Sequence, residues 1–166
     1  MRVILADAGA KISASDISDA MSTEAARRAK ELGIEAEFYT SDLESVSGSY
    51  NTVTCVDVAI HYPSEKMAEM IDHLCSLSEE RVIISFAPYT WYYALLKKVG
   101  ELFPGPSKTT RAYLHEESLV ADTLKKNGFE ITRDDMTATN FYFSRLFEAK
   151  KVWTNKQIMY SHLFTN

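Results

Sequence analysis

Short apolar and β-branched runs alternate along this chain with longer segments in which apolar residues recur every three to four positions. The short runs are typical of strands buried in a sheet, and the longer segments are typical of amphipathic helices. Strands are predicted at residues 11–14, 34–39, 51–56, 81–86, 129–133 and 140–147, and helices at residues 18–32, 64–77, 88–103 and 116–126. This alternation predicts an α/β fold with a mostly parallel sheet, closed by a hairpin-like pair of strands. Residues 2–8 fit either the end of a helix or a short strand.

The centre of the predicted domain is segment 51–63, which reads Asn-Thr-Val-Thr-Cys-Val-Asp-Val-Ala-Ile-His-Tyr-Pro. Its β-branched first half has the length expected of a strand that is buried on both faces of a parallel sheet. The strand is followed by Asp57, His61 and Tyr62, and Ser64 is then expected to cap the next helix. In open α/β sheets, ligands bind beyond the carboxyl ends of the strands, so this junction is the predicted ligand site.

Composition disfavours several classes of function. The chain has 166 residues, of which 46% are hydrophobic, and this is enough for one sizeable core. A net charge of -5 argues against binding through the phosphates of a nucleic acid. No apolar run approaches the roughly 20 residues of a membrane-spanning helix, and no signal or transit peptide is visible. Cys55 and Cys75 are expected to be buried and reduced, and no zinc-like spacing assigns metal ligands.

Three acidic residues follow strand-like segments, at Asp16, Asp42 and Asp57. In a nucleotide-binding sheet, an acid at the end of the second strand accepts hydrogen bonds from both ribose hydroxyls. Asp42 is placed to accept from an adenine amino group, with Leu43 or Ile17 packing on the ring. Aspartate is also common at strand ends because it stabilises turns, which is the alternative for each residue alone. Placement at three successive strand ends favours a nucleotide-like ligand.

A loop stiffened by proline and glycine carries Lys108 and Arg111 three positions apart, after a helix rich in aromatic residues. A cationic loop beside aromatic side chains suits a flat, apolar ligand that bears carboxylates. The alternative is a solvated surface loop, and composition leaves both open.

The histidines differ in their context. His61, four residues past Asp57, lies at the mouth of the predicted site and is the best candidate for binding a ligand. The other three, His73, His115 and His162, are expected to be structural.

Seven stretches of the chain resemble the magnesium-protoporphyrin IX methyltransferase family. The most specific are Gly-Pro-Ser-Lys at 105–108 and Phe-Tyr-Phe-Ser-Arg at 141–145. The stretches lie at residues 13–18, 41–45, 55–63, 84–88, 100–108, 111–115 and 137–145. The similarity runs from about residue 9 to residue 149, so residues 1–149 are expected to form a partial methyltransferase domain. Residues 150–166 are expected to be a floppy extension outside it.

The resemblance implies a class I methyltransferase with a Rossmann-like sheet and helices on both faces. It implies transfer of a methyl group from S-adenosylmethionine to a propionate of Mg-protoporphyrin IX, in chlorophyll synthesis. The implied location is a chloroplast, or the cytoplasm or membrane periphery of a phototrophic bacterium. The magnesium chelatase of the same pathway is an implied partner, nucleic acid is not, and membrane association is at most peripheral.

The same resemblance assigns roles to individual residues. The expected cofactor-binding residues are Asp16 and Ile17 near the ribose and adenine, Asp42 and Leu43 at the adenine, and Val56 and Asp57 at the methionine end. His61 and Tyr62 are the expected catalytic residues on the substrate side, and Lys108 and Arg111 are our own candidates for the substrate carboxylates. A propionate is already ionised at neutral pH, so His61 is expected to position the substrate rather than to act as an obligate base.

The chain departs from the family at its start, where the first strand and the Gly-x-Gly-x-Gly loop that approaches the cofactor are absent. In this fold that strand is central, so the isolated chain is expected to fold poorly, or to use residues 2–8 as a substitute strand. Both ends resemble those of a truncated gene model or a degenerate copy. The alternatives are a non-catalytic porphyrin-binding or regulatory remnant, or a related methyltransferase with a different carboxylate or hydroxyl substrate.

Overall fold

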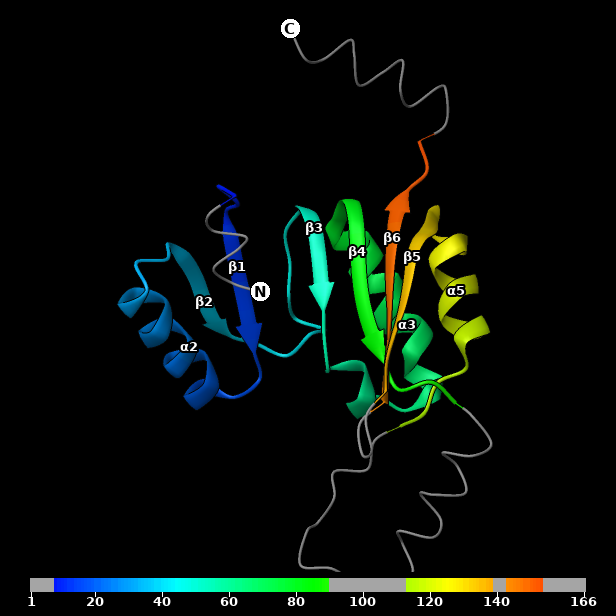
Figure 1. Cartoon of the computed structure of the whole chain (residues 1–166), viewed down its shortest axis with the longest axis horizontal. Coiled ribbons are helices and arrows are strands. Elements are labelled where there is room, and N and C mark those ends of the chain that lie inside the picture. The colour runs from blue at the N-terminus through cyan, green and yellow to red at the C-terminus, as the bar shows by residue number, and fades with distance from the viewer. Residues whose placement is uncertain (1–7, 90–112, 139–142, 154–166) are drawn as a thin grey trace, which may run out of the picture. The chain divides into compact units, whose positions relative to one another are not determined.

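A computed structural model of the chain describes residues 8–89, 113–138 and 143–153. It divides into two compact units, residues 1–48 and residues 49–166, and each is described by itself (Figure 1). The first contains a two-stranded sheet and the second a four-stranded sheet. Strands and helices alternate through most of the described chain, which confirms the α/β class. Several predicted features lie outside the described residues. They are the segment 2–7, most of the helix predicted at 88–103, and residues 154–166 of the tail.

The first unit is a strand–helix–strand motif. Its elements are β1 (Ile12–Asp16), α2 (Asp19–Glu31) and β2 (Ala36–Thr40). The two strands are parallel, with Ile12 opposite Ala36 and Asp16 opposite Thr40. Ser18 caps α2 by accepting a hydrogen bond from the main-chain nitrogen of Met21 (3.4 Å). Gly33 follows the helix in the left-handed region (φ +66°), which a glycine adopts without strain, so both predicted helix ends are confirmed.

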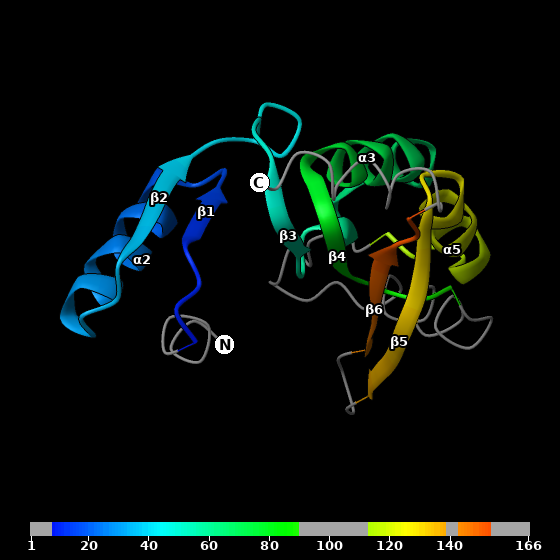
Figure 2. The same cartoon turned by 90° about the horizontal axis from the view of Figure 1, so that it is seen from above.

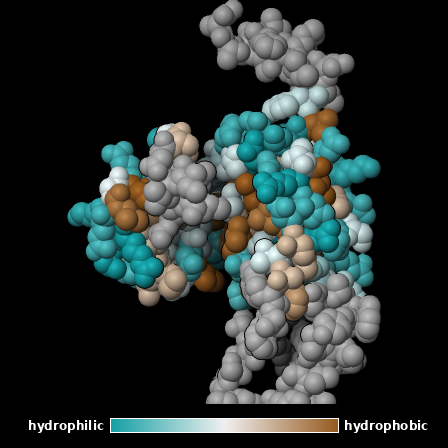
Figure 3. All heavy atoms as spheres, in the orientation of Figure 1, coloured by the Kyte–Doolittle hydropathy of each residue, from teal (hydrophilic) through white to brown (hydrophobic). Residues whose placement is uncertain are grey.

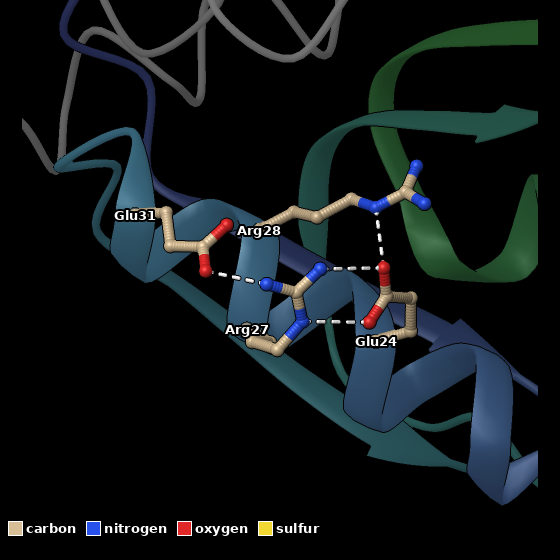
Figure 4. A network of polar contacts seen from close by, with 4 residues as sticks. All are labelled: Glu24, Arg27, Arg28 and Glu31. Carbon is tan, nitrogen blue, oxygen red and sulfur yellow. Dashed lines mark hydrogen bonds and ion pairs between the residues drawn. The ribbon is translucent and has the colours of Figure 1, made fainter.

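The exposed side of α2 carries a network of ion pairs (Figure 4). Arg27 binds Glu24 (2.8 Å) and Glu31, and Arg28 binds the same Glu24 (2.6 Å). The hydrogen bonds from Arg27 and then Arg28 lower the pKa of Glu24 to about 2. Hydrophilic side chains gather over this helix in the space-filling view (Figure 3). Because exposed ion pairs stabilise proteins little, we read the network as the solvated face of the helix.

The second unit holds a mixed sheet in the order β3-β4-β6-β5. Its elements are β3 (Tyr50–Cys55), a short 3-10 turn η1 (Ala59–His61), α3 (Ser64–Leu77), β4 (Ser78–Phe86), α5 (Glu117–Lys126), β5 (Phe129–Ala138) and β6 (Phe143–Lys151). β3 is parallel to β4, whereas β4 with β6 and β6 with β5 are antiparallel. The predicted hairpin-like pair is therefore confirmed, and it makes the sheet mixed rather than mostly parallel.

The core of the second unit lies between this sheet and two helices. α3 and α5 pack against each other and lie on the same side of the sheet (Figure 2). The ring of Phe86 meets that of Phe147 edge to face, with 5.2 Å between centroids. Further side chains with exposed fractions of 0–1% complete this core: Met67, Ile71, Leu74, Val82, Ile84, Val120 and Leu124. The helical spacing predicted for α3 is confirmed by this burial.

Two predictions around β3 are wrong. The strand is not buried on both faces: Cys55 is buried on the side of α3, whereas Thr52 and Thr54 are exposed. The reason is that, within this unit, the described helices cover only one face of the sheet. Ser64 does not cap α3 either, because Pro63 holds the cap position and Ser64 is the first helical residue. The Ser64 hydroxyl instead lies 3.5 Å from the main-chain oxygen of Leu114.

Four of the described strands, β1, β2, β3 and β5, pair along one edge only. Among the described strands, β1 pairs only with β2, and β3 pairs only with β4. In the fold that the resemblance implies, β1 and β3 are the strands that flank the first strand. Buried ladder groups without partners cost about 1–3 kcal/mol each, against a typical net stability of about 5–15 kcal/mol.

We therefore expect the isolated 166-residue chain to unfold without a cooperative thermal transition above about 50 °C, a usual temperature for a stable small domain. Circular dichroism during heating measures this. A sharp transition above that temperature would show that the open edges are not costly.

Candidate functional site

Asp16 ends β1 with its carboxylate held in a turn. Its Oδ1 accepts a hydrogen bond from the main-chain nitrogen of Ser18 (2.8 Å). Its main-chain oxygen accepts from the nitrogen of Ser41 (3.0 Å), which joins the ends of β1 and β2. The side chain is exposed, and Oδ2 has no partner among the residues that the structure describes. The turn thus fixes the carboxylate and leaves one oxygen to accept hydrogen bonds from a ligand.

Asp42 follows β2 in a second turn at the same end of the sheet. Its Oδ1 accepts from the main-chain nitrogen of Ser45 (2.7 Å). Hydrogen bonds from the side chain and the main chain of Ser45 lower the pKa of Asp42, so it is ionised and only accepts. Leu43 beside it is half-buried, and Ile17 is 78% exposed. The structure therefore brings Asp16 and Asp42 to one end of the β1–β2 sheet, as predicted; their roles stay predictions.

Asp57 lies two residues past β3 in an unusual backbone conformation. Its φ of +60° falls in the left-handed region, which few residues other than glycine adopt. Its nitrogen donates to the hydroxyl of Ser85 (2.9 Å), and that hydroxyl lies 3.5 Å from Oδ1 of Asp57. Ser85 is 3% exposed, on β4. The buried Ser85 thus holds Asp57 in this strained conformation. Val56, the residue before Asp57, is 42% exposed.

Sequence reasoning did not select Ser85 as a site residue. The available signal was a polar residue inside an otherwise apolar strand, in the stretch Ile-Ser-Phe-Ala-Pro at 84–88. A buried hydroxyl needs a hydrogen-bond partner, but the sequence does not say which one. Only the parallel register, which sets Cys55 opposite Ile84, brings Ser85 to the end of β3.

His61 and Tyr62 lie on the turn η1 and directly after it. The nitrogen of His61 donates to the oxygen of Val58 (3.0 Å), and the nitrogen of Tyr62 donates to the oxygen of Ala59 (3.1 Å). The turn presents His61 to solvent, whereas Tyr62 is half-buried. Both residues are thus beyond the carboxyl end of β3, where the sequence placed them, and their catalytic role stays a prediction.

A short segment, residues 113–115, lies against this turn and against the end of β4. The nitrogen of Tyr113 donates to the oxygen of Ile60 (2.8 Å). The nitrogen of His115 donates to the oxygen of Ala87 (2.9 Å), and the oxygen of His115 accepts from the nitrogen of Tyr89 (2.7 Å). His115 itself is buried, as expected of a structural histidine. Pro88 and Tyr89, where the aromatic helix was predicted to begin, are not helical but run beside this segment.

Other predicted features have simple outcomes. Lys108 and Arg111 lie outside the described residues. Cys55 and Cys75 are free and buried, which confirms the predicted burial, and burial raises the pKa of each thiol to about 12. In residues 8–89, 113–138 and 143–153, no three His, Cys, Asp or Glu side chains are grouped to hold a metal ion. None of the helices in these ranges is long and apolar enough to cross a membrane.

Comparison with known protein families gives two matches. Residues 55–151 match the family described as magnesium-protoporphyrin IX methyltransferase C-terminus. Residues 2–80 match a general methyltransferase domain. The first match contains every candidate residue of the second unit, and the second contains those of the first unit.

Two curated proteins are similar to most of the chain. The chloroplastic magnesium protoporphyrin IX methyltransferase of Arabidopsis thaliana is 56% identical over 152 residues, which are 90% of this chain and 49% of that protein. The magnesium-protoporphyrin O-methyltransferase of Synechocystis is 51% identical over 152 residues, 90% of this chain and 66% of that protein. The chain therefore spans about half of one relative and just under two thirds of the other.

Solved structures show the same fold. The Synechocystis magnesium protoporphyrin IX methyltransferase with bound S-adenosylhomocysteine superposes with a TM-score of 0.81 at 47% identity, covering 91% of this chain and 68% of that one. A methyltransferase of Methanosarcina mazei, only 17% identical, superposes with a TM-score of 0.71 over 92% of this chain and 87% of that one. The predicted methyltransferase fold is thus confirmed. Because the family match covers more than half of the chain, and the Synechocystis enzyme is this similar, the chain belongs to the magnesium-protoporphyrin IX methyltransferase family.

Proposed function

We propose that the chain carries part of an O-methyltransferase that uses S-adenosylmethionine to esterify a propionate of Mg-protoporphyrin IX. The observation that carries the proposal is the 47% identity to a solved enzyme of that name. That match covers 91% of this chain. A second solved form of the same Synechocystis enzyme contains S-adenosylmethionine.

The acids of the first unit suit the donors of this cofactor. S-adenosylmethionine supplies a methyl group that is activated by the positive charge on its sulfur. In our proposal Asp16 accepts from the ribose through its open Oδ2, and the ionised Asp42 accepts from the adenine amino group. Ile17 and Leu43 supply apolar contact with the ring. A carboxylate held by a turn is preorganised, so it loses little freedom on binding.

In the second unit, the end of β3 is the proposed place of methyl transfer. Val56 and Asp57 are proposed to adjoin the methionine end of the cofactor, and Ser85 holds the main chain there. His61 and Tyr62 are proposed to face the porphyrin, and Lys108 and Arg111 to bind its carboxylates. This places positioning groups on both sides of the reacting atoms.

The reaction needs alignment more than acid–base chemistry. A propionate has a pKa near that of glutamate, about 4.3, and is ionised at neutral pH. The ester forms when a propionate oxygen takes the methyl group, and the sulfonium becomes a thioether without any proton moving. Holding the oxygen, carbon and sulfur in line can remove several kcal/mol of the barrier, on the order of 7–11 in well-oriented systems.

Compartment and partner complete the proposal. The Arabidopsis relative is named as chloroplastic, and we propose the same compartment, or a phototrophic bacterium, for this chain. Magnesium chelatase is the proposed supplier of the substrate, because insertion of magnesium must precede esterification of the magnesium porphyrin. We also propose that residues 1–149 act as one methyltransferase domain. The predicted boundary at residue 150 is two residues too early, because Lys150 and Lys151 pair in β6, and we propose that the rest of the tail lies outside the domain.

The proposal predicts methyl-ester formation in a chimera in which this chain replaces the 152-residue stretch that it matches in the Synechocystis enzyme. The chimera supplies the rest of that enzyme. Incubation with Mg-protoporphyrin IX and S-adenosylmethionine should yield the monomethyl ester, detected by liquid chromatography and mass spectrometry. Porphyrin fluorescence quenching without ester or cofactor binding would instead indicate a non-catalytic remnant. Methylation of only other carboxylates or hydroxyls would indicate a different substrate.

In the same chimera, Asp16→Asn should weaken the binding of S-adenosylhomocysteine by about tenfold or more, since a hydrogen bond to a charged acceptor contributes about 1.5–3 kcal/mol. Isothermal titration calorimetry measures the Kd. Asp19→Asn is the matched control, because Asp19 accepts only from Thr40 in the described structure (3.1 Å). Equal Kd values for Asp16→Asn and the unmutated chimera would remove Asp16 from the proposed site.

Replacement of His61 tests whether it positions the substrate or acts as a base. We expect His61→Gln to lower kcat/KM for the porphyrin by about 10- to 100-fold, the usual effect of misplacing a reacting group by about 1 Å. The pH profiles of kcat/KM should have the same shape in both proteins between pH 6 and 9. A base would give the unmutated protein an inflection in this range that the variant lacks, and this result would contradict the positioning role.

A further inference from the structure

His115 is a buried histidine with an unusual hydrogen bond. Its exposed fraction is 0%, and its Nε2 lies 3.0 Å from the main-chain oxygen of Ala59. A carbonyl oxygen only accepts, so Nε2 carries the proton and Nδ1 carries a lone pair. Nδ1 is buried without a partner in the described part of the chain. Burial lowers the pKa of His115, so the imidazole is a neutral, fixed donor.

The acceptor of this hydrogen bond belongs to the turn that carries His61. Ala59 is 0% exposed, and its oxygen also accepts from the nitrogen of Tyr62 (3.1 Å). The carbonyl of Ala59 thus accepts two hydrogen bonds, which have different effects. The bond from Tyr62 closes the turn on itself, whereas the bond from His115 comes from 56 residues away and fixes the turn against the rest of the unit.

The main chain beside His115 extends the same attachment. The nitrogen of Tyr113 donates to Ile60 (2.8 Å), while His115 exchanges main-chain hydrogen bonds with Ala87 and Tyr89. The segment 113–115 therefore joins η1 to the end of β4. The side chain of His115 adds a hydrogen bond to the turn at Ala59, two positions before His61.

Packing alone does not account for a histidine at this position. An apolar side chain of similar size would fill the space without leaving Nδ1 buried and unpaired, which costs free energy. What an apolar side chain cannot supply is the N–H that bonds to the Ala59 oxygen. The turn that depends on this bond presents the two candidate catalytic residues.

We propose that His115 is a positioning residue for methyl transfer, because its Nε2–H holds the η1 turn, and with it His61 and Tyr62, in the orientation that meets the porphyrin. This inference rests on the proposed function, because the reaction that His115 would assist is the proposed methyl transfer. The contact itself can be tested without that reaction.

Replacing His115 by glutamine or by asparagine in the same chimera separates the effect of the hydrogen bond from the effect of packing, because both side chains end in an amide and differ by one methylene group. The amide nitrogen of glutamine reaches about as far as Nε2 of histidine, whereas that of asparagine reaches only about as far as Nδ1. His115→Gln should therefore keep kcat/KM for Mg-protoporphyrin IX within about threefold, and His115→Asn should lower it by about tenfold or more. The Kd of S-adenosylhomocysteine should stay unchanged in both variants. Val120→Ala, a core substitution on α5, is the control for a general loss of stability.

Amide hydrogen exchange gives a readout that does not need catalysis. In His115→Asn the amide hydrogens of Tyr62 and Tyr113 should exchange about tenfold faster, because their partners lie on the released turn. In His115→Gln and Val120→Ala they should exchange as in the unmutated protein.

Equal activity of the Asn and Gln variants, or unchanged exchange at Tyr62 and Tyr113, would overturn the positioning role and leave His115 as a packing residue. If the unmutated chimera forms no methyl ester, the proposed function fails. The exchange experiment then still decides whether His115 holds the turn.

Discussion

The parallel pairing of β3 with β4 is the interaction on which the geometry of the second unit depends. With Cys55 opposite Ile84, both strands end at the same edge of the sheet. Asp57 can then reach Ser85, and the segment 113–115 can bond to both η1 and the main chain after β4. A shift of one residue in this register would turn Ser85 to the opposite face and leave the left-handed conformation of Asp57 without its partner.

The same edge shows a division between buried and exposed polar groups. Ser85 and His115 are buried, and each hydrogen-bonds the main chain of the loop after β3. Asp57 and His61, on that loop, are exposed. Polar groups are costly to bury unless they are bonded, so the two buried ones are the groups most constrained to a single arrangement. The positions of Asp57 and His61 therefore depend on the hydrogen bonds that Ser85 and His115 make.

In the first unit, each candidate carboxylate is held by a local contact. Asp16 and Asp42 are each fixed by a main-chain nitrogen two or three residues along the chain. Such turns form wherever the sequence allows them, and the pairing of β1 with β2 then brings the two carboxylates to one end of the sheet. The candidate acids of the first unit are therefore organised by short-range contacts, whereas Asp57 and His61 depend on contacts between distant segments.

This contrast explains how far the sequence predicts the protein. Periodicity and the glycine after α2 determined the elements of the first unit, because these signals act within a few residues. The apolar spacing of α3 likewise determined its buried face, and three strand ends determined where Asp16, Asp42 and Asp57 lie. The family resemblance added a proposed role for each of these acids. None of these inferences needed to know which strand pairs with which.

Only the tertiary structure decided the rest. The exposed face of β3 follows from helices packing on one side of the sheet, which a run such as Thr-Val-Thr-Cys cannot reveal. The roles of Ser85 and His115 arise from partners 28 and 56 residues away, and sequence alone treats them as an ordinary strand residue and a structural histidine. The physical reason is that a buried polar side chain must be bonded, but only the register of the sheet and the path of the chain choose its partner.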